Sequence, residues 1–113
     1  MSALLEQLNE DMGEVVDRVG KSLVRVSVGG KGFGAGSVWH SDGLIITNAH
    51  VASGGSLRVT LPDGAIFPAR LLAHDKDRDL AALMMEATGL HTIEIGNSRD
   101  FQPGQWVLAT GHP

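Results

Sequence analysis

The sequence predicts an all-β domain, a small antiparallel barrel or sandwich, preceded by one amphipathic helix. The chain of 113 residues holds 15 glycines and four prolines but only two Trp and three Phe, which is typical of short strands joined by tight turns. Apolar residues recur every three or four positions before Gly20 and with a period of about two after it. Turn signals then follow roughly every eight to twelve residues, as in small all-β domains.

Residues 2–19 predict the helix. Their apolar side chains run from Leu4 to Val19 at steps of three and four, with acidic and amide side chains between them. Ser2 is placed to cap the first turn and Gly20 to end the last one. Two partners for the apolar stripe stay open, namely the barrel of the same chain and another subunit.

Seven strands are predicted after the helix. Ser41–Gly43 and Pro62–Gly64 each contain Asp-Gly between apolar runs and predict tight hairpins. The glycine-rich stretch Gly29–Gly34 also predicts a hairpin, because it lacks the Gly-Lys-Ser/Thr ending of a phosphate-binding loop. The predicted strands are Leu23–Val28, Gly34–Trp39, Leu44–Asn48, Leu57–Leu61, Ile66–His74, Leu80–Met85 and Gln105–Thr110.

Composition argues against several classes of partner. The net charge of −4 comes from mixed signs without a block of Lys and Arg, so nucleic acid is not an expected partner. Apolar runs are too short to span a membrane. The start of the chain has no basic segment of the kind that opens a signal peptide. This predicts a cytoplasmic protein, or a periplasmic or extracytoplasmic one if a leader was removed.

The segment from Gly34 to Val51 reads GAGSVWHSDGLIITNAHV and resembles the HtrA/Deg type of trypsin-like serine proteases. The resemblance implies an antiparallel six- to seven-stranded Greek-key barrel, the first lobe of the trypsin-like fold, over residues 21–113. Residues 1–20 are then a separate N-terminal helix. The stretch 96–113 resembles the close of that first barrel, with His112 at the place of a family Asn.

The same resemblance implies two catalytic residues. The family places its general base at the His of Thr-Asn-x-His-Val, which is His50 in this sequence. Its orienting carboxylate opens a strand of the Asp-Leu-Ala-Leu kind, and the matching position is Asp79. Asp75 and Asp77 precede it and are interpreted as solvated loop charges. A serine nucleophile needs such an imidazole to take its proton and such a carboxylate to fix the tautomer.

The third member of the triad has no match, because none of the eight serines lies in a G-x-S-G-G context. The resemblance implies the lineage of a serine endopeptidase of unfolded or damaged polypeptides, and the missing serine predicts that this chain is inactive alone. Family members often assemble into oligomers, which implies a contact through the helix or an exposed face of the lobe. The alternative is a non-catalytic half-protease domain that acts as a binding or oligomerisation module.

A third interpretation, a metal-binding barrel, has less support. Five histidines invite it, but no two of them are spaced as an H-x-x-x-H pair and the chain has no Cys. No metal and no cofactor is therefore expected. The histidines in question are His40, His50, His74, His91 and His112.

Overall fold

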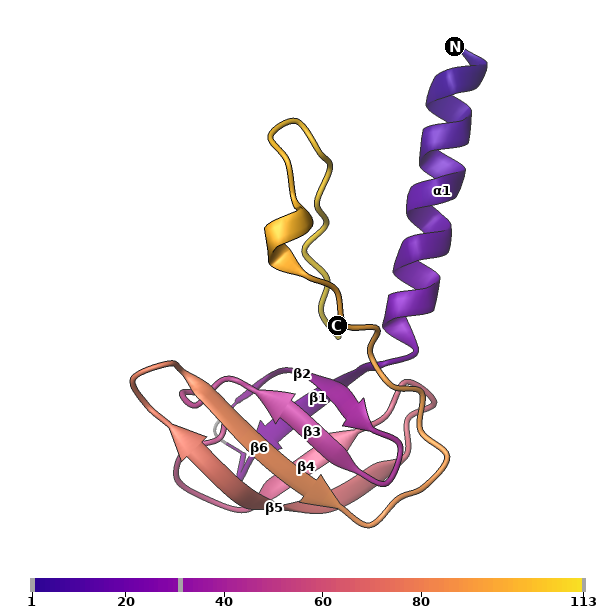
Figure 1. Cartoon of the computed structure of the whole chain (residues 1–113). Coiled ribbons are helices and arrows are strands. Elements are labelled where there is room, and N and C mark those ends of the chain that lie inside the picture. The colour runs from indigo at the N-terminus through magenta and orange to yellow at the C-terminus, as the bar shows by residue number, and fades with distance from the viewer. Residues whose placement is uncertain (1, 31, 113) are drawn as a thin grey trace.

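The computed structural model describes residues 2–30 and 32–112, as one α-helix, six strands and a short 3-10 helix (Figure 1). These elements are α1 (Ala3–Gly20), β1 (Leu23–Val28), β2 (Phe33–His40), β3 (Leu44–Thr47), β4 (Leu57–Thr60), β5 (Ile66–Asp75), β6 (Leu80–Met85) and η1 (Ser98–Asp100). Six of the seven predicted strands are confirmed, with ends that differ from the prediction by at most one residue.

The six strands form a closed antiparallel barrel in the order β1-β2-β3-β6-β5-β4. Pairing of β4 with β1, from Arg25 opposite Thr60 to Val28 opposite Leu57, closes it. Each strand therefore has a partner on both sides, and no edge is left open for another strand. This confirms the predicted Greek-key barrel, with six strands.

The core lies inside this barrel. Strand β1 alternates between buried and half-buried positions after Leu23, because successive side chains of a strand point to opposite faces. Side chains from β1, β2, β3, β4 and β6, most of them branched, meet at the centre, where close packing favours restricted rotamers. The largest fully buried side chains are Val24, Val26, Val38, Ile45, Val59, Leu83 and Met85.

The predicted hairpins are confirmed at the two Asp-Gly turns. Asp63 accepts a hydrogen bond from the Ala65 N–H at 2.9 Å, which is the Asx-type closure expected of this residue. Gly64 has φ +93° and Gly43 has φ +112°, a region that L side chains rarely adopt. The predicted glycine-rich hairpin joins β1 to β2, but its Lys31 lies outside the described residues.

The seventh predicted strand, Gln105–Thr110, is wrong. These residues have no regular structure, and they stand beside α1 and away from the barrel (Figure 1). A strand needs a neighbour to satisfy its N–H and C=O groups, and the β1–β4 ladder has already closed the sheet. The apolar pattern of 105–110 thus finds no free edge among the described strands, and the stretch 96–112 does not close the barrel.

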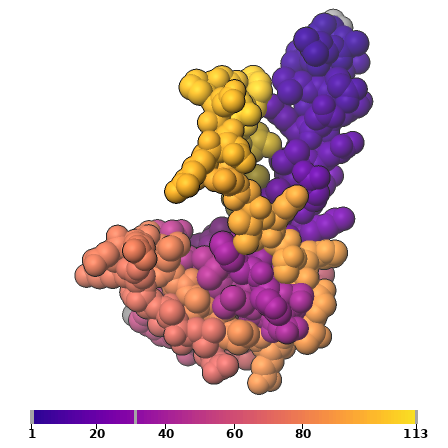
Figure 2. Space-filling view, in the orientation of Figure 1, coloured from indigo at the N-terminus to yellow at the C-terminus, as the bar shows by residue number. Residues whose placement is uncertain are grey.

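Helix α1 is confirmed, and Ser2 caps it by accepting the Leu5 N–H at 3.3 Å. The expectation that its stripe packs on the barrel is wrong, because no residue of α1 is buried. The helix projects from the barrel and stands beside the C-terminal stretch (Figure 2). Its stripe lines an open hollow of about 450 Å³ opposite Phe101 and Trp106. The barrel core is closed and filled mainly by side chains of its own strands, so the stripe does not enter it.

Among the described residues, no helix has the length and apolar character that crossing a membrane requires.

The close approach of Gly43 to the end of β6 gives a test of the barrel. A Cβ at Gly43 would meet the backbone oxygen of Met85, whereas a Cβ at Gly64 would meet nothing within 4 Å. We expect Gly64→Ala to lower the free energy of unfolding by about 1–2 kcal/mol, which is the cost of the left-handed backbone alone. Gly43→Ala should cost more than about 4 kcal/mol, because backbone has to move as well. Urea unfolding followed by circular dichroism measures both, and equal losses would contradict the close contact.

Candidate functional site

His50 lies just beyond β3, on a stretch of chain that the barrel anchors on both sides. Thr47, at the end of β3, is 5% exposed, and its Oγ1 donates to the C=O of Ala35 on β2 at 2.7 Å. Ala49 and Ala52, on either side of His50, are buried. The His50 side chain is 71% exposed. The small residues on either side of His50 are therefore buried, while its imidazole ring stays accessible to solvent.

A compact turn fixes the backbone around His50. The N–H groups of Val51 and Ala52 both donate to the C=O of Asn48, at 3.1 and 3.3 Å. The Ser53 hydroxyl donates to the C=O of His50 at 3.2 Å. Hydrogen bonds from both main chain and side chain thus restrain the turn.

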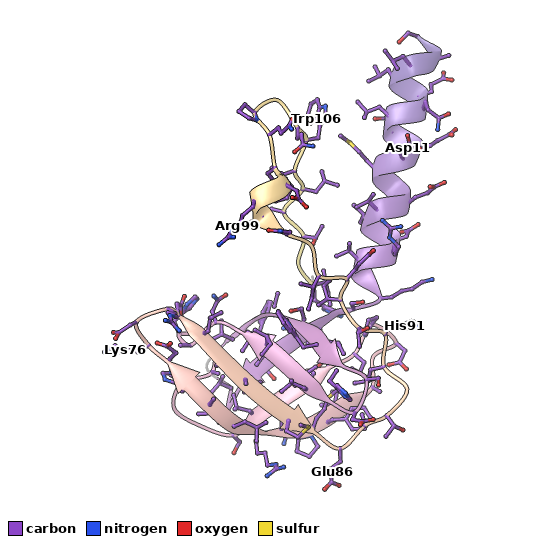
Figure 3. All side chains as sticks on the ribbon, in the orientation of Figure 1. Asp11, Lys76, Glu86, His91, Arg99 and Trp106 are labelled. Carbon is purple, nitrogen blue, oxygen red and sulfur yellow. The ribbon has the colours of Figure 1, made fainter. Side chains whose placement is uncertain are left out.

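Asp79 ends the turn between β5 and β6. It is the one non-glycine residue with positive φ, at 54°, among residues 2–30 and 32–112, a conformation that costs energy and persists only when the surroundings impose it. Two contacts hold its backbone: its N–H donates to the C=O of Lys76 at 3.3 Å, and Asn48 Nδ2 donates to its C=O at 3.0 Å. Figure 3 shows this turn, marked by Lys76, at the end of the barrel opposite to His91.

The Asp79 carboxylate contacts His50 twice. Oδ2 lies 2.7 Å from Nδ1 of the ring, and Oδ1 accepts the His50 backbone N–H at 2.9 Å. A carboxylate only accepts hydrogen bonds, so the contact selects the tautomer with a proton on Nδ1 and leaves Nε2 free to act as a base. The two residues that the sequence predicted as a pair are therefore in contact, and their catalytic roles stay predictions.

Hydrogen bonds keep Asp79 ionised. The backbone N–H of His50 is the largest cause that lowers the pKa of Asp79 below its ordinary value of 3.8, and the ring N–H of His50 comes next. Partial loss of water opposes the shift, while the charge of His50 and the N–H of Ala49 add to it.

The other acidic residues of the turn have different contacts. Asp75 accepts the Arg78 N–H at 3.2 Å and lies 3.8 Å from its guanidinium, which agrees with its interpretation as a loop charge.

Within the part of the chain that the structure describes, the other histidines do not form a metal site with His50. His40, the nearest His in sequence, contacts Asp42 within the β2–β3 hairpin. Among residues 2–30 and 32–112, no three His, Cys, Asp or Glu side chains converge on a point that could hold a metal ion.

One further contact at the site involves a residue that sequence reasoning had left aside. Nε2 of His74, on β5, lies 3.2 Å from the C=O of Ala49. No motif marks His74. The contact follows from the pairing of β5 with β6, which places His74 opposite Ala81, and such a register cannot be derived from local sequence pattern alone.

The sequence is similar to that of known proteins. Residues 34–113 match the family described as the trypsin-like peptidase domain. The chloroplastic Protease Do-like 1 of Arabidopsis thaliana is 44% identical over 86 residues, which cover 74% of this chain and 20% of that protein. The mitochondrial serine protease HTRA2 of Drosophila grimshawi is 40% identical over 83 residues, which cover 71% of this chain and 20% of that protein.

A solved structure has a similar fold. The crystal structure of the serine endoprotease from Yersinia pestis superposes with a TM-score of 0.70 at 31% sequence identity, over 74% of this chain and 32% of that one. The chain therefore spans about a fifth of the length of the two curated relatives and about a third of the solved chain.

The hydrogen bonds at Asp79 predict how it titrates. Its pKa should lie below 3.8 in the folded chain, so its ionisation stabilises the fold above the unfolded pKa, and this contribution is lost as the pH falls through the folded pKa. His50→Ala removes the ring but keeps the backbone N–H, the larger cause. We expect that variant to raise the pKa of Asp79 only part of the way back.

Carbon-detected NMR of the Asp79 carboxyl between neutral and acidic pH measures both values, with the acid-unfolded chain as reference. A wild-type midpoint at the ordinary value would contradict the hydrogen bonds. A complete return in His50→Ala would show that the ring, and not the backbone N–H, lowers the pKa.

Proposed function

We propose a function from one premise: the chain belongs to the trypsin-like peptidase family, within which it is of the HtrA/Deg serine protease lineage. In this proposal residues 21–113 form the first lobe of a protease domain and residues 1–20 a separate helix. His50 is the general base and Asp79 the carboxylate that orients it. The observation that carries the proposal is the double contact of the Asp79 carboxylate with the His50 ring and backbone, at 2.7 and 2.9 Å.

The proposed chemistry is acyl transfer to a serine. A serine hydroxyl placed beside Nε2 of His50 loses its proton to that nitrogen as its oxygen attacks the peptide carbonyl. Asp79 holds Nδ1–H and stabilises the imidazolium that forms. The proton then passes from Nε2 to the leaving amine, and the cycle repeats with water to release the acyl group. Neither metal nor cofactor enters these steps.

This chain supplies the base and the orienting carboxylate but not the nucleophile. None of its serines lies in a G-x-S-G-G context, and Ser53, near the site, donates its hydroxyl to the C=O of His50. We therefore propose that the isolated chain does not hydrolyse peptides, since a dyad without nucleophile and oxyanion hole has no route to the acyl intermediate. The relatives are named as proteases, so the proposed substrates of a complete enzyme are polypeptides. The family resemblance further implies that these polypeptides are unfolded or damaged.

The cellular compartment stays a prediction. The names of the relatives place one in the chloroplast and one in the mitochondrion. Because similar first lobes serve in different compartments, likeness to them does not choose between the cytoplasmic and the extracytoplasmic alternatives.

Activity of a chimeric protease tests the dyad. We expect purified 113-residue chain to leave unfolded casein intact, and we expect cleavage when it replaces the first lobe of the Yersinia endoprotease. In this chimera Asp79→Asn should lower kcat by about 10⁴-fold, the loss typical of a wrong tautomer. His50→Ala should lower it by about 10⁶-fold, the loss typical of a missing base. Asp77→Asn, in the same turn, is the matched control and should leave kcat unchanged. An active chimera that tolerates Asp79→Asn would contradict the assignment.

A second proposed function, that of a binding or oligomerisation module, is supported by exposed apolar side chains near the C-terminus. Phe101, Trp106 and Val107 are 64%, 75% and 70% exposed. They lie on the irregular C-terminal stretch, whose inner side faces α1 across the open hollow. Large apolar side chains that gather outside a core are typical of surfaces that contact another protein.

Light scattering tests this second function. A module that self-associates through this surface should elute as a dimer, and the variant Trp106→Ser should shift it to a monomer because the surface loses its largest apolar side chain. Ile66→Thr, at another exposed apolar position, on β5 (61% exposed), is the control and should keep the dimer. A monomer of wild-type chain at high concentration would leave the protease lobe as the only proposed role.

A further inference from the structure

The peptide group between Ala49 and His50 is held at both ends. Its N–H, which belongs to His50, donates to Asp79 Oδ1 at 2.9 Å. Its C=O, which belongs to Ala49, lies 3.2 Å from Nε2 of His74 in a partly buried contact. A carbonyl only accepts, so Nε2 of His74 carries the proton in this contact.

The planarity of the peptide links the two ends. The atoms from one Cα to the next lie in one plane, with C=O and N–H on opposite sides. A group that fixes the direction of the C=O therefore fixes the direction of the N–H as well. A hydrogen bond to the C=O also polarises the peptide and makes its N–H a stronger donor. His74 thus acts on the same peptide group that binds the Asp79 carboxylate.

We propose that His74 is a positioning residue, which aims the Ala49–His50 peptide N–H at Asp79 and so seats the carboxylate against the His50 ring. Its part in catalysis rests on the proposed roles of His50 and Asp79, whereas its effect on the geometry does not.

The surroundings of His74 combine an apolar hollow with one hydrogen-bond acceptor. His74 lies on β5 opposite Ala81 of β6, so a strand pair of the barrel carries it. Trp39, Ile46 and Leu80 line the same apolar hollow of about 320 Å³ as His74. His74 is exposed and borders this hollow, while the Ala49 carbonyl gives its N–H an acceptor.

The variants for the test separate the hydrogen bond from charge and bulk. His74→Gln keeps an N–H donor at about the reach of Nε2, and His74→Leu keeps bulk but has no donor. Both are uncharged, so the comparison between them isolates the hydrogen bond from any imidazolium charge. His74→Asn carries the same amide on a chain one carbon shorter, which does not extend to the Ala49 carbonyl. It provides a second loss-of-contact variant in case His74→Leu does not fold.

Two measurements on the 113-residue chain report the position of the peptide. Hydrogen exchange of the His50 amide should be about tenfold faster in His74→Leu and His74→Asn, the change expected for one lost hydrogen bond, and close to wild type in His74→Gln. The NMR titration midpoint of the Asp79 carboxyl should rise in His74→Leu relative to His74→Gln. Core amides such as those of Ile45 and Val59 are the internal control and should exchange as in wild type.

Equal behaviour of the Gln and Leu variants would overturn the proposal, and so would a parallel increase in exchange at the core amides, which indicates general loss of stability. These readouts need no nucleophile. An inactive chimera would therefore count against His50 as the base without touching this inference, and a failed exchange experiment would count against His74 alone.

Discussion

The closure of the barrel between β1 and β4 is the constraint on which the rest of the structure depends. Antiparallel pairing of these strands, with Val26 opposite Val59, gives every strand two neighbours and encloses a core of branched side chains. A closed sheet has little freedom of register, because a slip by one residue would turn the buried faces outward. The positions of all the loops at its ends follow from that register.

The candidate dyad is a consequence of this register. Strand β3 pairs with β6 so that Thr47 lies opposite Ala81. His50 comes three residues after the first, and Asp79 comes two residues before the second, so both leave the sheet at the same end. The turn at Asn48 and the left-handed backbone of Asp79 then bring the carboxylate to the ring. The strands provide the proximity, and the side chains add only the last hydrogen bonds.

The sequence predicts the parts of the molecule that depend on local pattern. Alternation correctly predicts six of its seven strands, Asp-Gly predicts two hairpins, and family resemblance selects His50 and Asp79. The failures concern distant partners. Gln105–Thr110 has the pattern of a strand, but whether an edge is free depends on how β1 and β4 meet. The apolar residues of α1 have a helical period, but this period does not show which surface the apolar face packs against. The contact of His74 with Ala49 also depends on register.

The contacts between Asp79 and His50 bear on how a complete protease would be assembled. Both contacts between Asp79 and His50 are made by residues of this barrel and its turns. If His50 is the base, as proposed, its ring is oriented before any nucleophile arrives. A second lobe would then have only to place a serine beside Nε2 and oxyanion donors around the substrate carbonyl. Preorganisation of this kind moves the entropic cost of orientation from the chemical step to folding. In this proposal the orientation of the dyad depends on the first lobe alone, whereas catalysis would require the contact between two lobes.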